Sequence, residues 1–238
     1  MIPEIINHIW LQGGIPEKYT SNYQKWTDLN PTWQHNMWDE KSLLKLCNHN
    51  QFIYYHTLDT LINKVNFLKY ILMYRIGGVY VDLDTIPLKS MDNFLNEVEV
   101  KNIDLLSTLS IRYPFNTEIP IKRFNTYEII LPARPSLMYY PNGDKAILLD
   151  NPFLISSANN IFWINLIEFC SKRTNYKEGF GAVLPHEPLG PYGMTDFLFN
   201  NYPSPYMQNI LVIPPIYWNE PKTISDDQYI IHNSDKGW

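Results

Sequence analysis

The sequence of 238 residues is poor in the features that mark several large protein classes. It has two cysteines, Cys47 and Cys170, without the spacing of metal ligands, so a disulfide framework and a cysteine-based metal site are excluded. We interpret both as reduced, buried thiols inside helices. Lysine and arginine form no basic stripe, and the net charge is −5, which argues against binding nucleic acid or an anionic membrane.

Long apolar runs are also missing. No run approaches the roughly 18 apolar residues that a membrane span needs. The N-terminal stretch MIPEIINHIWLQGG has no basic region, and its apolar part is too short for a signal peptide. We therefore expect a soluble protein without a membrane span, made in a reducing compartment. The expected location is the cytoplasm, or the host cytoplasm for a viral source.

The patterning that is present predicts alternating strands and helices. A compact β-branched run at 4–11 is followed by a helical pattern, a second strand and a short helix, which is typical of an α/β fold with largely parallel strands. No repeat or linker divides the chain, so 1–238 is predicted to be one domain. The further predicted helices are 59–76, 160–173 and 190–202, and the further predicted strands are 79–84, 103–111, 126–135, 209–220 and 227–234.

Two aspartates stand one residue apart in the stretch GGVYVDLDTIP, residues 77–87. Because side chains alternate along a strand, Asp82 and Asp84 are expected on one face, and at the carboxyl end of a parallel strand that face opens on a ligand crevice. Neighbouring carboxylates repel one another, and a hard divalent ion such as Mn²⁺ or Mg²⁺ is the usual relief. The stretch therefore predicts a ligand and metal site.

This stretch, extended upstream to NFLKYILMYRIGGVYVDLDTIPLKSMD, resembles the Asp-x-Asp region of family 32 glycosyltransferases and of the large clostridial glucosylating toxins. Other segments resemble family motifs in the same order: IPEIINHIWLQGG, DNPFLISSANNIFW with LGPYGMTDFL, and the closing YIIHNSDKGW. The resemblance covers the chain from its first strand to its last residue, with a weak middle. It implies an A-type glycosyltransferase fold, with a Rossmann-like, mostly parallel central sheet flanked by helices.

The same resemblance implies a metal-dependent, retaining glycosyltransferase. Such an enzyme moves a hexose from a nucleoside-diphosphate sugar to a hydroxyl acceptor, and we expect a UDP-sugar rather than a GDP-sugar as donor and a glycan as acceptor. A divalent ion, Mn²⁺ or Mg²⁺, would stabilise the charge that develops on the leaving diphosphate.

Catalytic and metal-binding roles follow from the resemblance for a few positions. Asp84 would bind the ion directly, and Asp82 would contact the ion or the ribose and sugar hydroxyls. His232 in the closing tail would add a metal ligand, with Asn233 as the alternative. From the residues alone, a histidine after an apolar strand also fits a structural role.

Donor-binding roles follow in the same way. Trp10 would pack on the base, Ile9 would offer backbone contacts, and Tyr80 would line the donor pocket. Asn151 would reach the sugar, and the last donor contacts implied are those of Lys236 and Trp238 with the phosphates. From the residues alone, Trp10 also fits a core position and Asn151 a helix N-cap or a turn.

The chain departs from the family on the helix before the aspartates. Where the family commonly has Ser-Asp-x-x-Arg, this sequence has Val65, Asn66 and Lys69. Asn66 and Lys69 are three residues apart and share a helix face, so a donor contact stays possible. An amide and an ammonium differ from the groups they replace, so we expect a change in which sugar hydroxyls are recognised. The tail departs too, at residues 234–236.

Two other functions stay open. The letters DLDTI are similar to the motif of haloacid-dehalogenase-like phosphohydrolases, with Lys222, Asp226 and Asp227 downstream, although Thr85 follows the second aspartate too early. The substitutions at Asn66 and Lys69 leave room for a nucleotide-sugar-binding protein on a degraded transferase fold.

Overall fold

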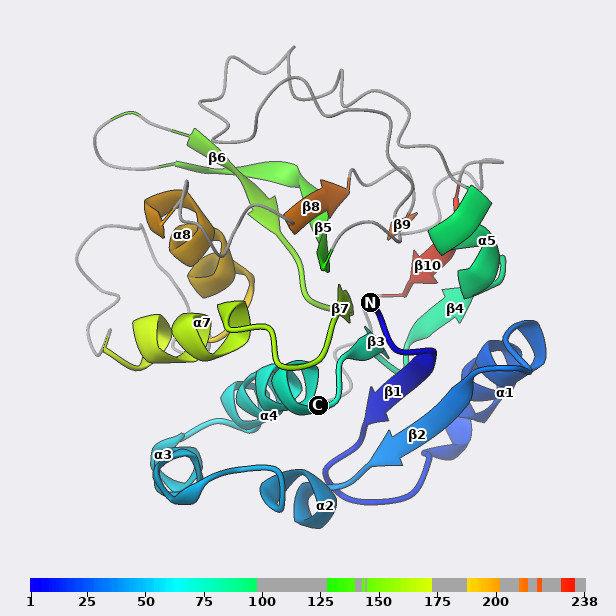
Figure 1. Ribbon diagram of the computed structural model, residues 1–238, viewed down its shortest axis with the longest axis horizontal. Helices are drawn as coiled ribbons and strands as arrows, with labels where there is room; N and C mark the ends of the chain where they lie inside the picture. Colours follow the sequence, from blue (N-terminus) through cyan, green and yellow to red (C-terminus); the bar gives the residue numbers. More distant parts are fainter. Residues whose placement is uncertain are drawn as a thin grey trace.

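The computed structural model describes residues 1–97, 128–139, 143, 145–172, 188–201, 210–213, 218–219 and 228–233. Figure 1 shows the arrangement of its helices and strands. The strands of the central sheet are β1 (Ile5–Ile9), β2 (Gln34–Trp38), β3 (Gly78–Val81), β5 (Ile129–Tyr139), β6 (Lys145–Leu149), β7 (Phe153–Ser156) and β8 (Ile210–Ile213).

This seven-stranded sheet has the order β2-β1-β3-β7-β5-β6, and β8 pairs with β5. Strands β1, β2, β3, β5 and β8 run in one direction, whereas β6 and β7 run in the opposite direction. The predicted mostly parallel sheet is therefore confirmed. The antiparallel β7 lies between β3 and β5, at the centre of the sheet.

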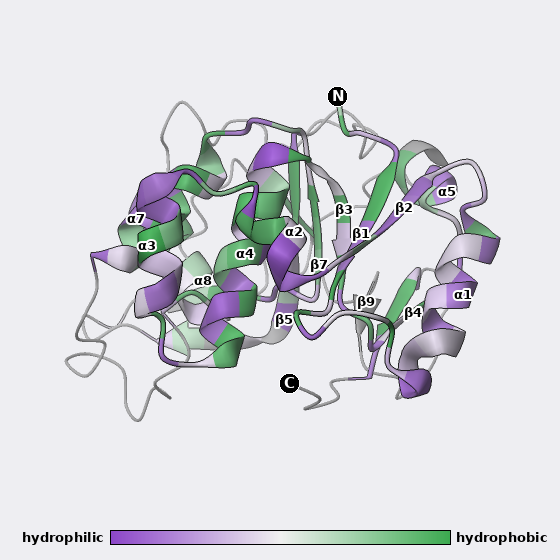
Figure 2. Cartoon of the chain, turned by 90° about the horizontal axis from the view of Figure 1, so that it is seen from below, coloured by the Kyte–Doolittle hydropathy of each residue, from purple (hydrophilic) through white to green (hydrophobic). Residues whose placement is uncertain are grey.

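Helices cover both faces of the sheet (Figure 2). On one side α4 packs with α7 and α8 around a large apolar cluster, and on the other side Trp26 of α1 and Phe94 of α5 contribute to a second cluster. The helices are α1 (Thr20–Leu29), preceded by the 3-10 turn η1 (Glu17–Tyr19), α2 (Glu40–Leu44), α3 (His49–Thr57), α4 (Leu61–Arg75), α5 (Met91–Glu97), α7 (Phe162–Ser171) and α8 (Pro191–Asn201). Among the described residues, no helix is both long and apolar enough to cross a membrane.

Two glycines bring α4 and β3 close to their neighbours. Gly77 and Gly78 have φ angles of 68° and 83°, in the left-handed region that favours glycine. A Cβ on Gly78 would lie 2.5 Å from the carbonyl oxygen of Ile5, and one on Gly77 would lie 2.6 Å from the amide nitrogen of Ala158. Both residues therefore have to be glycine, and the predicted helix stop is confirmed at this point.

A second, three-stranded sheet has the order β4-β10-β9 and comprises β4 (Thr85–Pro87), β10 (Ile230–His232) and β9 (Trp218–Asn219). Strand β10 pairs antiparallel with β4, and His232 lies opposite Thr85. This pairing brings a late segment of the chain beside the two aspartates.

Several expected elements differ from the structure. The strand expected at 79–84 ends at Val81, because Asp82 begins a turn in which the Thr85 amide and hydroxyl both donate to the Asp82 carbonyl, at 3.1 and 2.6 Å. Cys47 does not lie inside a helix, because α2 ends at Leu44 and Asn48 caps a new helix, α3, that the sequence did not predict. The strand expected at 103–111 lies outside the described residues.

Candidate active site

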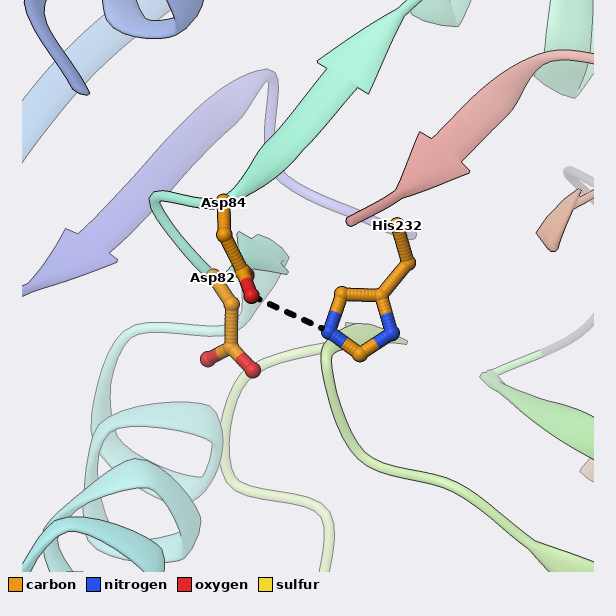
Figure 3. Close-up of side chains that lie close together, drawn as sticks. All are labelled: Asp82, Asp84 and His232. Atoms are coloured by element: carbon orange, nitrogen blue, oxygen red, sulfur yellow. Dashed lines mark ion pairs between the residues drawn. The ribbon is translucent and has the colours of Figure 1, made fainter. Parts of the chain in front are cut away.

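The two aspartates meet a histidine from the other end of the chain. Asp82 and Asp84 come from the turn between β3 and β4, and His232 ends β10. One ligand atom from each of the three lies within 4.8 Å of the others, and the His232 Nε2 atom is 3.4 Å from Asp84 Oδ2 (Figure 3). The structure thus places together three of the four predicted metal ligands. The fourth, Asn233, has an exposed side chain, and its backbone N–H donates to the Asp84 carbonyl at 3.1 Å.

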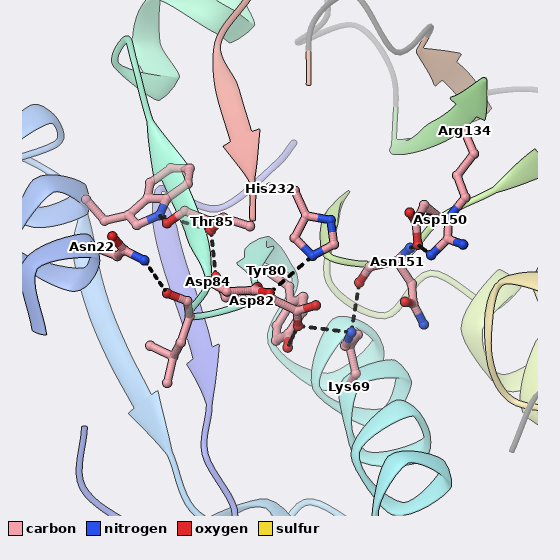
Figure 4. Close-up of polar contacts among 12 residues, drawn as sticks. Asn22, Lys69, Tyr80, Asp82, Asp84, Thr85, Arg134, Asp150, Asn151 and His232 are labelled. Carbon is pink, nitrogen blue, oxygen red and sulfur yellow. Dashed lines mark hydrogen bonds and ion pairs between the residues drawn. The ribbon is translucent and has the colours of Figure 1, made fainter. Parts of the chain in front are cut away.

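Asp82 is held by two donors from the interior. The Lys69 ammonium donates to Asp82 Oδ1 at 3.3 Å and to the carbonyl oxygen of Asn151 at 2.8 Å, and the Tyr80 hydroxyl donates to the same Asp82 oxygen. The Lys69 nitrogen also lies 4.5 Å from the centre of the Tyr80 ring. Because both donors reach Oδ1, they fix the orientation of this carboxylate (Figure 4).

The electrostatics of the site favour the protonated forms of Tyr80 and His232. Burial raises the pKa of Tyr80 well above its usual value, and the Asp82 carboxylate adds to this, so the phenol remains a hydrogen-bond donor. Burial alone would lower the pKa of His232. The hydrogen bond to Asp84 and the charges of Asp84, Asp82 and Asp150 outweigh burial, so the pKa of His232 is raised.

An amide pair stands beside the lysine. The Asn151 side chain donates to Asn66 Oδ1 at 3.0 Å, and both residues are buried. Asn151 lies between β6 and β7 and caps no helix. The structure therefore brings Asn66 and Lys69, two of the family departures, to the same partner, Asn151.

One ion pair near the site was not predicted from the sequence. Arg134 Nη2 donates to Asp150 Oδ1 at 2.9 Å, and the same carboxylate oxygen accepts the backbone N–H of Asn151 at 2.9 Å (Figure 4). The position of Asp150 directly before Asn151 was the available signal. Nothing in the sequence around Arg134 pointed to it, because the pairing depends on the register of β5 and β6.

The predicted base-binding residues lie at the same edge of the sheet. Asn7 of β1 pairs with Tyr80 of β3, so the ends of these parallel strands are neighbours. Ile9 at the end of β1 is fully buried, and the half-buried Trp10 ring packs edge-on against Tyr19 at 6.0 Å between centroids. The predicted phosphate contacts Lys236 and Trp238 lie outside the described residues.

The residues present fit a divalent ion. Two carboxylates and an imidazole are a donor set that Mn²⁺ accepts, and the carboxylate oxygens also suit Mg²⁺. Asp84 is buried, so its negative charge is poorly screened by water and favours a cation beside it. The arrangement can hold an ion at an edge of the sheet where ligands commonly bind.

Comparisons with known proteins show similarity to glycosyltransferases. Residues 16–101, which include Lys69, Asp82 and Asp84, match the family described as glycosyltransferase sugar-binding region containing DXD motif. The chain is 28% identical over 219 residues to inositol phosphoceramide mannosyltransferase 1 of Schizosaccharomyces pombe, covering 88% of this chain and 60% of that protein. It is also 28% identical over 111 residues to the initiation-specific alpha-1,6-mannosyltransferase of Candida albicans, covering 41% of this chain and 28% of that protein.

The chain thus spans 60% or less of the length of these two relatives. Among solved structures, the PaToxG glycosyltransferase superposes with a TM-score of 0.54 at 15% identity, over 85% of this chain and 70% of that one. This likeness concerns the fold, and it confirms the predicted A-type glycosyltransferase architecture.

Proposed function

We propose that the protein is a retaining glycosyltransferase of family 32, which uses a divalent ion to transfer a hexose from a nucleoside-diphosphate sugar to a hydroxyl acceptor. The observation that carries this proposal is the cluster of Asp82, Asp84 and His232 at the carboxyl edge of the parallel strands. The matched sugar-binding region and the names of the relatives support the same reaction class.

Asp84 and His232 would hold the ion, with Asp82 as the third ligand or as an acceptor for ribose and sugar hydroxyls. The ion, when bound, would supply Lewis-acid stabilisation for the leaving diphosphate. Hydrogen bonds from Lys69 and Tyr80 fix the orientation of the Asp82 carboxylate. Asp82 would therefore need no rearrangement when the nucleotide sugar binds.

The remaining donor contacts are assigned by position. Trp10 and the backbone of Ile9 would face the base, and Tyr80 would support the floor of the pocket. The pair of Asn66 and Asn151 would contact the sugar, because amides both donate to and accept from hydroxyl groups. Lys236 and Trp238 are proposed to contact the phosphates.

The names of the relatives refine the choice of sugar. Both relatives described above are named for the transfer of mannose, so mannose is the leading hexose for this chain. The acceptor is proposed to be a glycan hydroxyl, and the S. pombe name adds inositol phosphoceramide as a second acceptor to test.

The test is a donor panel with and without metal. The purified protein is incubated with UDP- and GDP-hexoses, GDP-mannose included, and release of nucleoside diphosphate is measured in Mn²⁺, in Mg²⁺ and in a chelator. We expect slow hydrolysis or transfer that needs the ion and is lost in Asp84→Ala. Asp28→Ala, which removes an exposed carboxylate on α1, is the matched control and should keep full activity.

Other outcomes would decide against the proposal. Normal turnover of Asp84→Ala in chelator would contradict a metal-assisted reaction, and an inverted anomeric configuration in the product would contradict retention. Nucleotide-sugar binding without turnover on any acceptor would favour a degraded transferase. Phosphate release from a generic phosphomonoester would instead favour the phosphohydrolase.

A further inference from the structure

A buried cation lies inside the proposed ion site. The side chain of Lys69 is 2% exposed, and that of its partner Asp82 is 15% exposed. The ammonium is held from one side by the Asn151 carbonyl at 2.8 Å and lies over the Tyr80 ring. These contacts come from β3 and from the segment before β7, so the fold itself holds Lys69 beside Asp82.

The position of Lys69 changes the charge that an incoming ion meets. Asp82 and Asp84 supply two carboxylates, of which Asp82 lies 3.3 Å from the Lys69 ammonium and Asp84 lies 3.4 Å from the His232 ring. Coulomb interactions are strong where water is excluded, so a neighbouring positive charge opposes the binding of a second cation. The two carboxylates together with Lys69 should therefore bind a divalent ion less tightly than the two carboxylates would alone.

We propose that Lys69 is a resident countercharge that keeps the site weak for a divalent ion until a nucleoside diphosphate supplies further negative charge. Ion and nucleotide would then bind cooperatively, each raising the affinity for the other by the same factor. Lys69 acts here through Asp82, as a positioning and charge-setting residue. This inference rests on the proposed function, and it differs from the expectation that Lys69 mainly recognises sugar hydroxyls.

The test measures Mn²⁺ affinity in the absence of turnover. Binding of Mn²⁺ to the full chain is followed by calorimetry and by the EPR signal of unbound Mn²⁺, with and without UDP or GDP. We expect Lys69→Met to bind Mn²⁺ alone at least tenfold more tightly than wild type, and the gain on adding nucleotide to shrink accordingly. Lys69→Arg keeps the charge and should stay within about threefold of wild type, well under the 1.4 kcal/mol that a tenfold change represents.

The variant Tyr80→Phe distinguishes the effect of the Lys69 charge from the effect of the orientation of Asp82. It removes the second donor to Asp82 Oδ1 without changing the charge of the site, so Mn²⁺ affinity should change far less than in Lys69→Met. If Lys69 served only to orient Asp82, Lys69→Met would weaken Mn²⁺ binding, and that result would overturn the inference. Unchanged Mn²⁺ affinity with altered donor-sugar selectivity would overturn it in favour of sugar recognition.

Two results in wild-type protein keep the inference testable if Lys69→Met does not fold. Tight Mn²⁺ binding without nucleotide, unaltered when UDP or GDP is added, would contradict a countercharge. Weak Mn²⁺ binding that tightens at least tenfold with nucleotide would support it. If the wild-type protein binds neither Mn²⁺ nor either nucleotide, the proposed function itself is overturned. If Lys69→Met folds and shows the same cooperative binding as wild type, only the role of Lys69 is overturned.

Discussion

Two buried histidines in this molecule have opposite tendencies to take up a proton. His8 lies in β1 beneath α1, with its ring 5.1 Å from that of Tyr23, and within the described part of the chain neither of its nitrogens has a well-formed hydrogen bond. Burial lowers the pKa of His8 to about 3, His35 adds to this, and the backbone of Val81 opposes it in part. His232 is also mostly buried, yet the pKa of His232 is raised.

The difference lies in the neighbours rather than in the depth of burial. His232 faces the carboxylate of Asp84, whereas His8 is surrounded by rings and by a second histidine. A nearby negative charge favours the protonated form of a buried imidazole. The packed face of β1 therefore favours the neutral form of His8, whereas the candidate active site favours the protonated form of His232.

Removing the Asp84 carboxylate should lower the pKa of His232 and so bring it closer to that of His8. We expect Asp84→Asn to reduce transfer by about 10²- to 10³-fold, as for loss of one group that stabilises developing charge. In the ion-free variant the pKa of His232 should fall, because burial then outweighs the remaining attraction. Transfer assays and an NMR titration of the imidazole measure the two effects. An unchanged pKa of His232 would show that Asp84 is not the group that raises this pKa.

Acid should destabilise the protein through His8. The pKa of His8 is depressed in the folded state, so the unfolded chain takes up the proton first, and stability falls as the pH drops below the unfolded pKa of 6.5 toward 3. Between pH 7.5 and pH 5 the contribution of His8 to the free energy of unfolding should fall by about 2 kcal/mol. Urea unfolding at both pH values measures the loss.

The variant His8→Phe removes the titrating group and keeps a ring between Tyr23 and Trp26. We expect the pH dependence of its stability to be flatter by the same amount. His49→Gln, at an exposed position, is the control and should keep the wild-type pH dependence. Equal acid sensitivity in wild type and His8→Phe would contradict this assignment.

The smallest effect is expected from Tyr80→Phe. The hydroxyl donates to a carboxylate that keeps its second donor, Lys69, so the free energy of unfolding should fall by about 1.5 kcal/mol at neutral pH. Urea denaturation measures the change, with the exposed Tyr139→Phe as control. A loss as large as that from unpairing a buried charge, about 3 kcal/mol or more, would mean that Tyr80 rather than Lys69 holds Asp82.

Local spacing was enough to predict part of the site. The interval between Asp82 and Asp84 and the helical step from Asn66 to Lys69 both indicated groups that the structure places together. The reason given for the aspartates was wrong, because the strand stops at Val81 and a turn, rather than alternation along a strand, presents them.

Long-range pairing limited the rest of the prediction. The family resemblance pointed to His232, but its place beside Asp84 depends on the register of β10 against β4, which no local pattern specifies. Arg134 and Asp150 were missed for a similar reason, since β5, which holds Arg134, and β6, which ends just before Asp150, pair through a bulge between Ala133 and Leu137. The antiparallel entry of β7 into the sheet was also beyond local patterning.

The pairing of β4 with β10 also has a consequence for protein synthesis. The turn that carries Asp82 and Asp84 leaves the ribosome long before His232, and β10 follows every other described strand. A growing chain can form the pairing of β1, β2 and β3 while its ion site still lacks the imidazole. The three candidate ligands can therefore come together only after translation has passed β10.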